Sequence, residues 1–312
     1  MITVLLATHN GADTIGRSLE AMSQLEVPAE GWEIIVVNNA SSDDTEALVR
    51  QWQDRLPLTY LVEPRLGKSK AINAGLALAR GDLIVMTDDD VLPDRNWLCE
   101  WRRVADAWPS LDVFGGAIVP EFGDHPPRWN LPRKSLTLLY GLTPVRPEGE
   151  IAPTDVAGAN LVIRRQLRDE GLRFDENFLV GDKGLMGEDT AFVRRAFEKG
   201  HRVGFAPGAR VRHIIHKEQI SWLWIHRRTF RHGGAVYWAE AQDALSTGGD
   251  WSVLPRWRIR RAVTLLLRTA SAALCFDRDK MFEHSRNLAH DLGAIRQAIT
   301  LRRQLPSARK NS

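Results

Sequence analysis

Residues 81–93 of the chain, GDLIVMTDDDVLP, combine an apolar run with an acidic cluster, and the fold is predicted outward from them. The apolar run at 83–86 has the length and the β-branched content of a buried strand. It stops at three successive carboxylates, Asp88, Asp89 and Asp90. Crowded carboxylates repel one another, and a cation such as Mg²⁺ or Mn²⁺, which prefers oxygen ligands and also binds phosphate, would relieve that repulsion. A solvated acidic turn at the end of a strand would contain the same residues. The flanking sequence is therefore needed to distinguish a metal site from such a turn.

Strands and helices alternate through the first 120 residues. Alternation at this spacing predicts βαβ units and a Rossmann-like, mostly parallel central sheet flanked by helices. Ligands of such sheets bind beyond the carboxyl ends of the strands, and three of these ends are polar: Thr8-His9-Asn10, Asn38-Asn39 and the three aspartates. A nucleotide fits such an edge, although the chain has neither GxGxxG after its first strand nor GxxxxGK[ST]. The expected strands are 2–7, 32–37, 58–62, 83–86 and 113–119, and the expected helices are 13–25, 45–55 with Ser42 or Asp43 as N-cap, 67–79 and 94–108.

The pattern changes after residue 120. Residues 123–153 are rich in Pro and Gly and predict a functional loop or lid. A strand at 158–165 follows, and Glu188 and Asp189 then open a helix at 190–199, where the helix dipole favours acidic residues whether or not they are catalytic. Short strands at 203–206 and 209–211 lead to His213 and His216. Helices are expected at 222–241 and, as a pair broken near 276–279, over 256–303.

Composition narrows the class of protein. The chain has 312 residues, of which 44% are hydrophobic and 26% charged, as is ordinary for a soluble globular protein. A net charge of +3 does not imply a nucleic-acid partner. No apolar run reaches about 18 residues, and the N-terminus lacks the basic region of a signal peptide. Cys99 and Cys275 are expected to be buried thiols in a reducing compartment. We therefore expect a cytoplasmic protein.

Six motifs over about residues 2–233 together resemble the family 2 glycosyltransferases of the GT-A fold. Each is weak alone, but all six occur in the family's order and spacing: ATHN at 7–10, VVNNASSDDT at 36–45, GKSKAINAG at 67–75, DDD at 88–90, GED at 187–189 and VRH at 211–213. The resemblance implies an α/β GT-A domain at 1–240, with a nucleotide-binding half at about 1–120 and an acceptor-binding half at about 121–240. Residues 241–312 then form a C-terminal helical extension.

The resemblance also implies the chemistry, a metal-dependent transfer of sugar with inversion at the anomeric carbon. Mn²⁺ or Mg²⁺ held by Asp90, Asp88 and His213 would neutralise charge on the departing nucleoside diphosphate, with His216 as the rival to His213. Asp189 would be the general base and Glu188 its positioning neighbour. The donor nucleotide would contact Thr8, Asn10, Asn38, Lys68, Asn73, Asp88, Asp89 and Arg228, with Arg227 and Arg231 as alternatives for clamping the diphosphate.

Asn38 departs from the family pattern, which has an aspartate at this position to accept the N3–H of the base. Asparagine both accepts and donates, so a UDP-sugar is favoured while GDP- and dTDP-sugars stay open. The acceptor is expected to be a glycan or a lipid-linked molecule of cell-surface polysaccharide or glycoconjugate biosynthesis. It would be recognised by residues 123–153 and those after Trp222.

The first helix of the extension, with Leu265, Leu266 and Leu267 among arginines, leaves three interpretations open. It packs on the core, pairs with a partner, or lies on a membrane surface. In the third case the protein would be peripheral on the inner face of the cell membrane.

Two other functions explain part of the pattern. A nucleotidyltransferase would carry a Gly-rich, basic phosphate loop after the first strand, and Thr8-His9-Asn10-Gly11 is a poor version of one. It would release pyrophosphate, whereas a glycosyltransferase releases a nucleoside diphosphate. A non-catalytic nucleotide-sugar-binding scaffold has no need of a base, and the Glu188-Asp189 pair argues against it.

Overall fold

The computed structural model of the chain describes residues 1–124, 126, 133–144, 146–176, 187–246 and 256–304. The chain divides into two compact units. The first holds the described residues up to Ile215 except Asp124 and Pro126, and the second holds these two residues and the described residues from His216 onward. The domain division predicted at residue 240 falls inside helix α8 (Trp222–Ser246) and stays a prediction.

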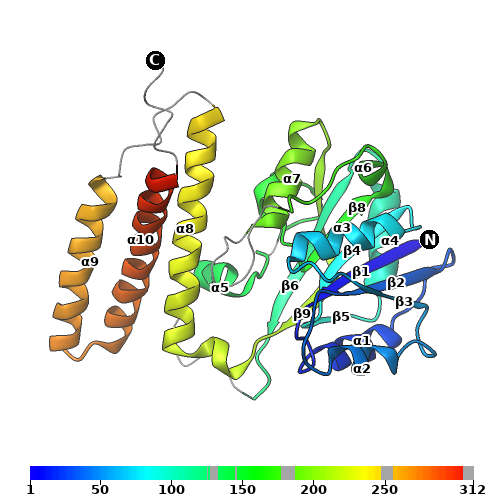
Figure 1. Ribbon diagram of the computed structural model, residues 1–312, viewed down its shortest axis with the longest axis horizontal. Coiled ribbons are helices and arrows are strands. Elements are labelled where there is room, and N and C mark those ends of the chain that lie inside the picture. The colour runs from blue at the N-terminus through cyan, green and yellow to red at the C-terminus, as the bar shows by residue number, and fades with distance from the viewer. Residues whose placement is uncertain (125, 127–132, 145, 177–186, 247–255, 305–312) are drawn as a thin grey trace. The chain divides into compact units, whose positions relative to one another are not determined.

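In the first unit the described residues form one sheet of nine strands, in the order β3-β2-β1-β4-β8-β6-β9-β5, with β7 paired to β9 (Figure 1). Strands β1 to β4 pair in parallel, as predicted. Strand β8 pairs antiparallel with β4 and β6, and β5 and β7 each pair antiparallel with β9. The strands are β1 Ile2–Thr8, β2 Trp32–Asn38, β3 Leu58–Val62, β4 Leu83–Asp88, β5 Val91–Pro93, β6 Val113–Glu121, β7 Gly149–Glu150, β8 Asn160–Arg164 and β9 Val203–Ile214.

The register of the parallel strands brings their polar ends to one level. Thr8 at the end of β1 lies opposite Asn38 at the end of β2, and Ala7 lies opposite Asp88 of β4. Strands β1, β2 and β4 are mostly apolar and almost fully buried, and each ends in a polar residue, Thr8, Asn38 or Asp88. This common edge is where ligands bind in open α/β sheets.

One face of the sheet carries a continuous apolar core. Side chains alternate along each strand, so Leu5 of β1 and Ile84 of β4 point to the same face. Helices α3 (Lys68–Leu78) and α7 (Glu188–Glu198) pack there through Leu76 and Phe192, both fully buried. Each such side chain contributes about 1.5–3 kcal/mol by its burial. A side chain at Gly75 would clash with Leu5, so this glycine lets α3 lie close to β1.

The remaining helices of the first unit flank these strands. Helix α1 contacts β5 and helix α4 contacts β9, where Trp97 and Trp101 are fully buried and the indole N–H of Trp97 donates to Asn160 at 2.9 Å. Asp44, and not Ser42 or Asp43, is the N-cap of α2. The helices are α1 Ile15–Ser23, α2 Thr45–Arg50, α4 Trp97–Ala107, α5 Arg133–Tyr140 and α6 Arg165–Asp169, with the 3₁₀ turn η1 Pro153–Asp155.

The structure corrects three expectations from the sequence. The region predicted as one loop, 123–153, contains helix α5 and strand β7, while Pro127, Arg128 and Trp129 lie outside the described residues. The two short strands expected at 203–206 and 209–211 are one strand, β9, whose pairing with β6 shifts register. Cys275 is exposed and Cys99 half-buried, so neither is a core thiol.

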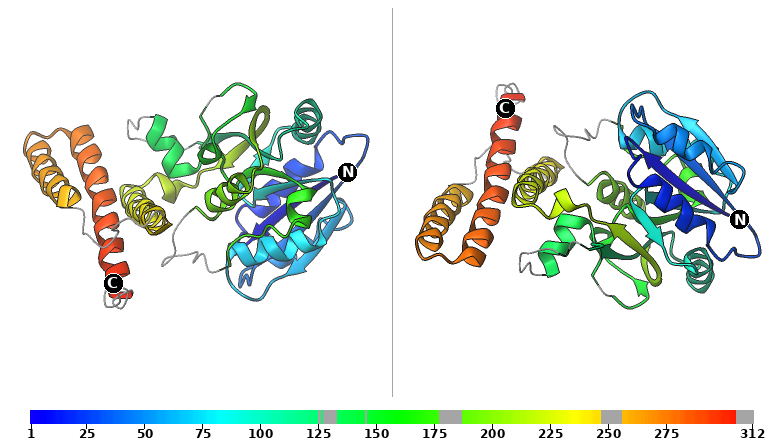
Figure 2. Two further views of the ribbon diagram at one scale, coloured as in Figure 1. Left: turned by 90° about the horizontal axis from the view of Figure 1, so that it is seen from above. Right: turned by 90° about the horizontal axis from the view of Figure 1, so that it is seen from below.

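The second unit contains three long helices, α8, α9 (Arg256–Leu274) and α10 (Arg278–Gln304), preceded by the 3₁₀ turn η2 Lys217–Ile220. Helix α10 lies between the other two (Figures 1 and 2). Two glycines allow α8 and α10 to approach closely. A side chain at Gly233 would clash with the backbone of His290, and a side chain at Gly293 would clash with the backbone of Phe230. Within the described residues, no helix is long and apolar enough to cross a membrane.

Candidate active site

The sheet register places Asp90 against His213. Strand β5 pairs antiparallel with β9 so that Val91 lies opposite His213, and the N–H of Ile214 donates to the carbonyl of Asp90 at 2.8 Å. These backbone contacts bring Nε2 of His213 within 3.0 Å of Oδ2 of Asp90. Two residues 123 apart in the chain are therefore held together by a strand pair.

The chemistry of this pair suits a divalent cation. Nδ1 of His213 lies 2.7 Å from the carbonyl oxygen of Tyr140, which can only accept, so Nδ1 carries the hydrogen and Nε2 faces Asp90. In neutral histidine that places a lone pair against a carboxylate, so a proton or a metal ion belongs between them. Burial would lower the pKa of His213, but the Asp90 carboxylate raises it above its ordinary value. Oδ1 of Asp90 is buried and has no hydrogen-bond partner among the described residues, which leaves a second oxygen for a cation.

The described part of the chain groups no three His, Cys, Asp or Glu side chains at metal-binding spacing. Asp90 and His213 would therefore be the protein ligands, with phosphate oxygens and water completing the shell, as is usual for Mg²⁺. Asp88, predicted as a third ligand, is engaged elsewhere in the structure, with Lys68.

Lys68 lies between the two acidic motifs. Its Nζ is 2.5 Å from Oδ1 of Asp88 and 3.8 Å from Oε1 of Glu188. Burial would lower the pKa of Lys68, but the charges of Asp88 and Glu188 outweigh burial and raise it, so the ammonium stays charged. Burial, opposed by Lys68, raises the pKa of Glu188. The ammonium group of Lys68 thus links the end of β4 to the start of α7.

Asp189 is held by backbone donors. The N–H of Gly158 donates to its Oδ2 at 2.5 Å and its own neighbour, Thr190, donates to Oδ1 at 2.8 Å. A Cβ at position 158 would lie 2.9 Å from Oδ2, so the close approach requires glycine. These groups surround a small pocket lined by Lys68, Thr87, Asp88, Gly158, Glu188 and Asp189, with Leu5, Ile72, Met86, Leu161 and Phe174 on its apolar side.

Asp89 is not one of the described residues that line this pocket. Its carboxylate accepts a hydrogen bond from the hydroxyl of Thr8, and Gly11 leaves it room because a side chain there would clash with Asp89. Burial and the neighbouring carboxylates of Asp90 and Asp88 raise the pKa of Asp89 to about 7, although Thr8 opposes them. The predicted donor contacts Thr8 and Asp89 are therefore bonded to each other.

Asn38 and Asn10, both predicted donor contacts, lie on this edge of the sheet. Asn38 is buried, and its amide donates to the hydroxyl of Tyr60 at 2.8 Å while its oxygen accepts the N–H of Ser41 at 3.0 Å. The oxygen of Asn10 accepts the N–H of Ser42 at 2.8 Å, with the Asn10 backbone at a positive φ of 52°. Each of the two carboxamides keeps further hydrogen-bonding capacity.

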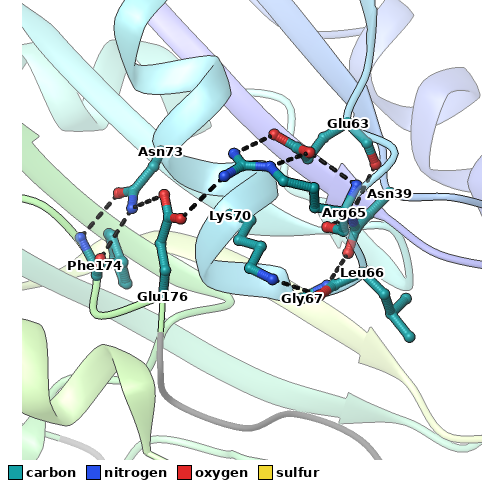
Figure 3. A network of polar contacts seen from close by, with 9 residues as sticks. All are labelled: Asn39, Glu63, Arg65, Leu66, Gly67, Lys70, Asn73, Phe174 and Glu176. Atoms are coloured by element: carbon teal, nitrogen blue, oxygen red, sulfur yellow. Dashed lines mark hydrogen bonds and ion pairs between the residues drawn. The ribbon is translucent and has the colours of Figure 1, made fainter.

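Asn39, which the sequence marks only as part of a polar strand end, forms hydrogen bonds that order the loop before α3 (Figure 3). Its amide donates to the carbonyls of Glu63 and Arg65 at 3.0 and 2.9 Å, and its oxygen accepts the N–H of Gly67 at 2.8 Å. All three partners belong to the segment that delivers Lys68 to the site. The sequence contains a signal for this role of Asn39. Side chains alternate along a strand, so the residue after Asn38 must point to the opposite face of the sheet.

Asn73, another predicted donor contact, is also engaged in the structure (Figure 3). Its carboxamide accepts the N–H of Phe174 and donates to the carbonyl of the same residue, both at 2.9 Å. It also donates to Glu176 at 3.2 Å. Asn73 thereby ties α3 to the chain that precedes α7.

Two predicted residues belong to the second unit and are described with it. Arg228 lies on α8 with its guanidinium 5.9 Å from the ring centroid of Trp224. His216, the rival metal ligand, is the N-cap of η2; its backbone N–H donates to Oε1 of Gln219 at 2.7 Å and its carbonyl accepts the N–H of Gln219 at 2.9 Å.

The chain is similar in sequence to known glycosyltransferases. The family model described as glycosyl transferase family 2 matches residues 3–171. The probable glycosyltransferase YdaM of Bacillus subtilis is 28% identical over 244 residues, which cover 73% of this chain and 53% of YdaM. The succinoglycan biosynthesis protein ExoM of Rhizobium meliloti is 26% identical over 243 residues, covering 77% of this chain and 75% of ExoM. The chain thus spans about half the length of YdaM and three quarters of ExoM.

Solved structures share the fold. The mannosyltransferase PcManGT from Pyrobaculum calidifontis, in complex with GDP-Man and Mn²⁺, superposes with a TM-score of 0.63 at 20% sequence identity. The match covers 95% of this chain and 86% of that one. The α/β sheet described above is therefore a GT-A fold.

Proposed function

The chain belongs to glycosyl transferase family 2, and we propose that this glycosyltransferase moves a sugar from a nucleotide-sugar donor to an acceptor hydroxyl with inversion at the anomeric carbon. The observation that carries the proposal is the meeting of two acidic motifs at one pocket. Asp88 ends strand β4 and Asp90 follows two residues later, Glu188 and Asp189 begin helix α7, and Lys68 lies between Asp88 and Glu188. A donor diphosphate and an acceptor hydroxyl need two such sets of groups side by side.

The donor side of the site would use Asp90 and His213. These residues would hold Mn²⁺ or Mg²⁺, which when bound neutralises charge on the nucleoside diphosphate as it leaves. Asp88, tied to Lys68, would face the ribose or the water shell of the cation. Thr8, Asn10 and Asn38 lie at the ends of β1 and β2, where the base and ribose would rest.

The acceptor side would use Asp189 as the general base. Its carboxylate is fixed by the N–H groups of Gly158 and Thr190, which leaves lone pairs for one more donor. An acceptor hydroxyl in that position would pass its proton to Asp189 as its oxygen attacks the anomeric carbon. Attack from the face opposite the leaving diphosphate gives inversion.

For the donor and the acceptor we propose a chemical class and not a single compound. The expected donors are UDP-sugars, with GDP- and dTDP-sugars as alternatives, since Asn38 both accepts and donates; PcManGT, which has the same fold, binds GDP-Man. The similarity to ExoM, a succinoglycan biosynthesis protein, supports a glycan or lipid-linked acceptor in polysaccharide or glycoconjugate synthesis. Both cysteines are free, which supports a reducing, cytoplasmic setting.

Calorimetry with UDP, GDP and dTDP, each with and without Mn²⁺, tests the donor site. One nucleotide should bind in a metal-dependent way, and Asp90→Asn should abolish the dependence because it removes a charged ligand. Asp54→Asn, at an exposed position, is the matched control and should bind like the wild type. If none of the three nucleotides binds folded protein, the proposal fails. Release of pyrophosphate in place of a nucleoside diphosphate would indicate a nucleotidyltransferase.

A further inference from the structure

Helix α9 has two apolar faces. One packs against α10 and buries Ala262, Leu265 and Ala272. At 3.6 residues per turn, positions 259, 263, 266, 267, 270 and 274 lie on the opposite side of the helix. All of these residues are exposed, and five of the six are large and apolar. We call them the apolar stripe.

The large side chains of the apolar stripe are open to solvent, with Ile259 the least exposed at 37%. The exposed fraction is 53% for Val263, 56% for Leu266, 66% for Leu267 and 81% for Leu274. Phe276, just after the helix, is 90% exposed, and Trp257 near its start is 55% exposed. Scattered apolar residues need no explanation, but a continuous row along one helix marks an interaction surface.

The charges on α9 indicate what covers the stripe. Its 19 residues include five arginines and no aspartate or glutamate. Arg258 is buried and paired with Glu240 at 2.7 Å, whereas Arg256, Arg260 and Arg268 are exposed. An apolar row beside exposed arginines complements a surface that has both apolar chains and negative charge.

We propose that α9 binds the surface of an anionic lipid bilayer through the apolar stripe, with its exposed arginines at the phosphate groups. The helix would lie along the surface and not cross it, because its other face is covered by α10. A second copy of the chain fits less well, since two such helices would bring arginines against arginines. The proposal rests on the second unit alone and does not depend on the donor chemistry proposed above.

Co-sedimentation with vesicles tests this proposal without any nucleotide or sugar. The 312-residue chain is mixed with vesicles of phosphatidylcholine alone, or of phosphatidylcholine with phosphatidylglycerol. We expect binding to the anionic vesicles that weakens as salt shortens the Debye length from about 10 Å at 0.1 M to about 3 Å at 1 M. Leu267→Glu combined with Leu274→Glu should weaken binding at least about tenfold, because each change places a charge where an apolar side chain enters the bilayer.

Val27→Glu is the matched control, because Val27 is 54% exposed and lies outside α9. It should bind vesicles like the wild type, and circular dichroism should show all variants folded. The proposal is overturned if the wild type ignores anionic vesicles, or binds neutral ones equally well. It is also overturned if Leu267→Glu/Leu274→Glu binds as the wild type does, or if light scattering shows a wild-type dimer that this variant converts to monomer with no vesicle binding by either protein.

Discussion

The ammonium group of Lys68 lies 2.5 Å from Oδ1 of Asp88, and this ion pair links the donor and acceptor sides of the site. Glu188 is the second partner, at 3.8 Å. Lys68 is the first residue of α3, so the helix that packs on β1 and β2 also positions this ammonium group. The positive charge offsets the repulsion among carboxylates that the sequence places at the end of β4 and at the start of α7.

Replacing Lys68 by methionine should impair nucleotide binding and shift the pH dependence of activity. We expect UDP or the preferred nucleotide to bind about 10- to 100-fold more weakly, since a charged contact at the site is lost. Lys68 opposes the rise in the pKa of Glu188, so its removal should raise that pKa further. The acidic limb of the pH–rate profile should then move to higher pH. Lys70→Met, two residues along, is the control, and an unmoved acidic limb in Lys68→Met would contradict the assignment.

A methyl group at position 158 should disable the base without unfolding the protein. In Gly158→Ala the new Cβ would lie 2.9 Å from Oδ2 of Asp189 and 3.1 Å from its Cβ, so the carboxylate must move. General-base catalysis is worth about 10²–10⁴-fold, and we expect a loss of kcat in that range. Calorimetry should show donor binding close to the wild type.

Gly16→Ala is the matched control, because nothing lies within 4 Å of a Cβ at Gly16. Asp189→Asn should resemble Gly158→Ala in its kinetics. If Gly158→Ala keeps full activity, Asp189 is not the base or its position is not critical.

Asn39→Ala should loosen the start of α3. Asn39 is 3% exposed, and its carboxamide satisfies three backbone groups of the loop before α3. Each buried group left without a partner costs about 1–3 kcal/mol, and the costs are not additive. We expect roughly 2 kcal/mol less stability in urea unfolding and weaker nucleotide binding, because Lys68 loses its anchor. Asn96→Ala, at a helix N-cap whose side chain makes no capping bond, should change neither. Unchanged nucleotide binding in Asn39→Ala would show that the loop positions itself.

Local pattern was enough to predict the parallel half of the sheet, and long-range pairing explains what was missed. Strand β3 has the predicted bounds, and β1, β2, β4 and β6 end within two residues of theirs, since buried runs and polar ends are local properties. The short strand β5 was not predicted. The antiparallel pairing of β8 with β4 joins residues about 80 apart, and no turn or spacing in the sequence encodes it. The single strand β9 was read as two because Pro207 and Gly208 look like a break, whereas pairing with β6 carries the strand across them.

The candidate site shows the same division. Acidic clusters at Asp88 and Glu188 stand out in the sequence because charge is unusual beside apolar runs. That Lys68 joins them could not be predicted, because the geometry depends on how α3 lies across the sheet. Gly158 was read only as the entry to a strand, since a glycine that makes room for one carboxylate looks like any other in the sequence.

Glu33 offers a test of the sheet that is independent of the site. It lies on β2, 4% exposed, and accepts hydrogen bonds from the Thr3 hydroxyl, the Arg80 backbone N–H and the Arg80 guanidinium at 2.7–2.8 Å. Burial alone would raise the pKa of Glu33, but these bonds outweigh it and hold the pKa below its ordinary value of 4.5. A carboxyl with a depressed pKa stabilises the fold above its unfolded pKa, and this contribution is lost as the pH falls through the folded value.

Glu33→Gln should therefore destabilise the protein at neutral pH and much less in acid. We expect a loss of about 1–3 kcal/mol in the free energy of unfolding at pH 7. Oε1 accepts from Thr3 and the Arg80 backbone while Oε2 accepts from the Arg80 guanidinium, and an amide has only one accepting oxygen and no charge. The difference between variant and wild type should shrink below about pH 4, as the wild-type carboxyl takes up its proton. Glu46→Gln is the control, since its pair with Arg50 is on the surface and worth about 0.3–0.5 kcal/mol. Urea unfolding at several pH values measures both, and a Glu33→Gln effect that is constant with pH would mean that packing, and not charge, is what Glu33 contributes.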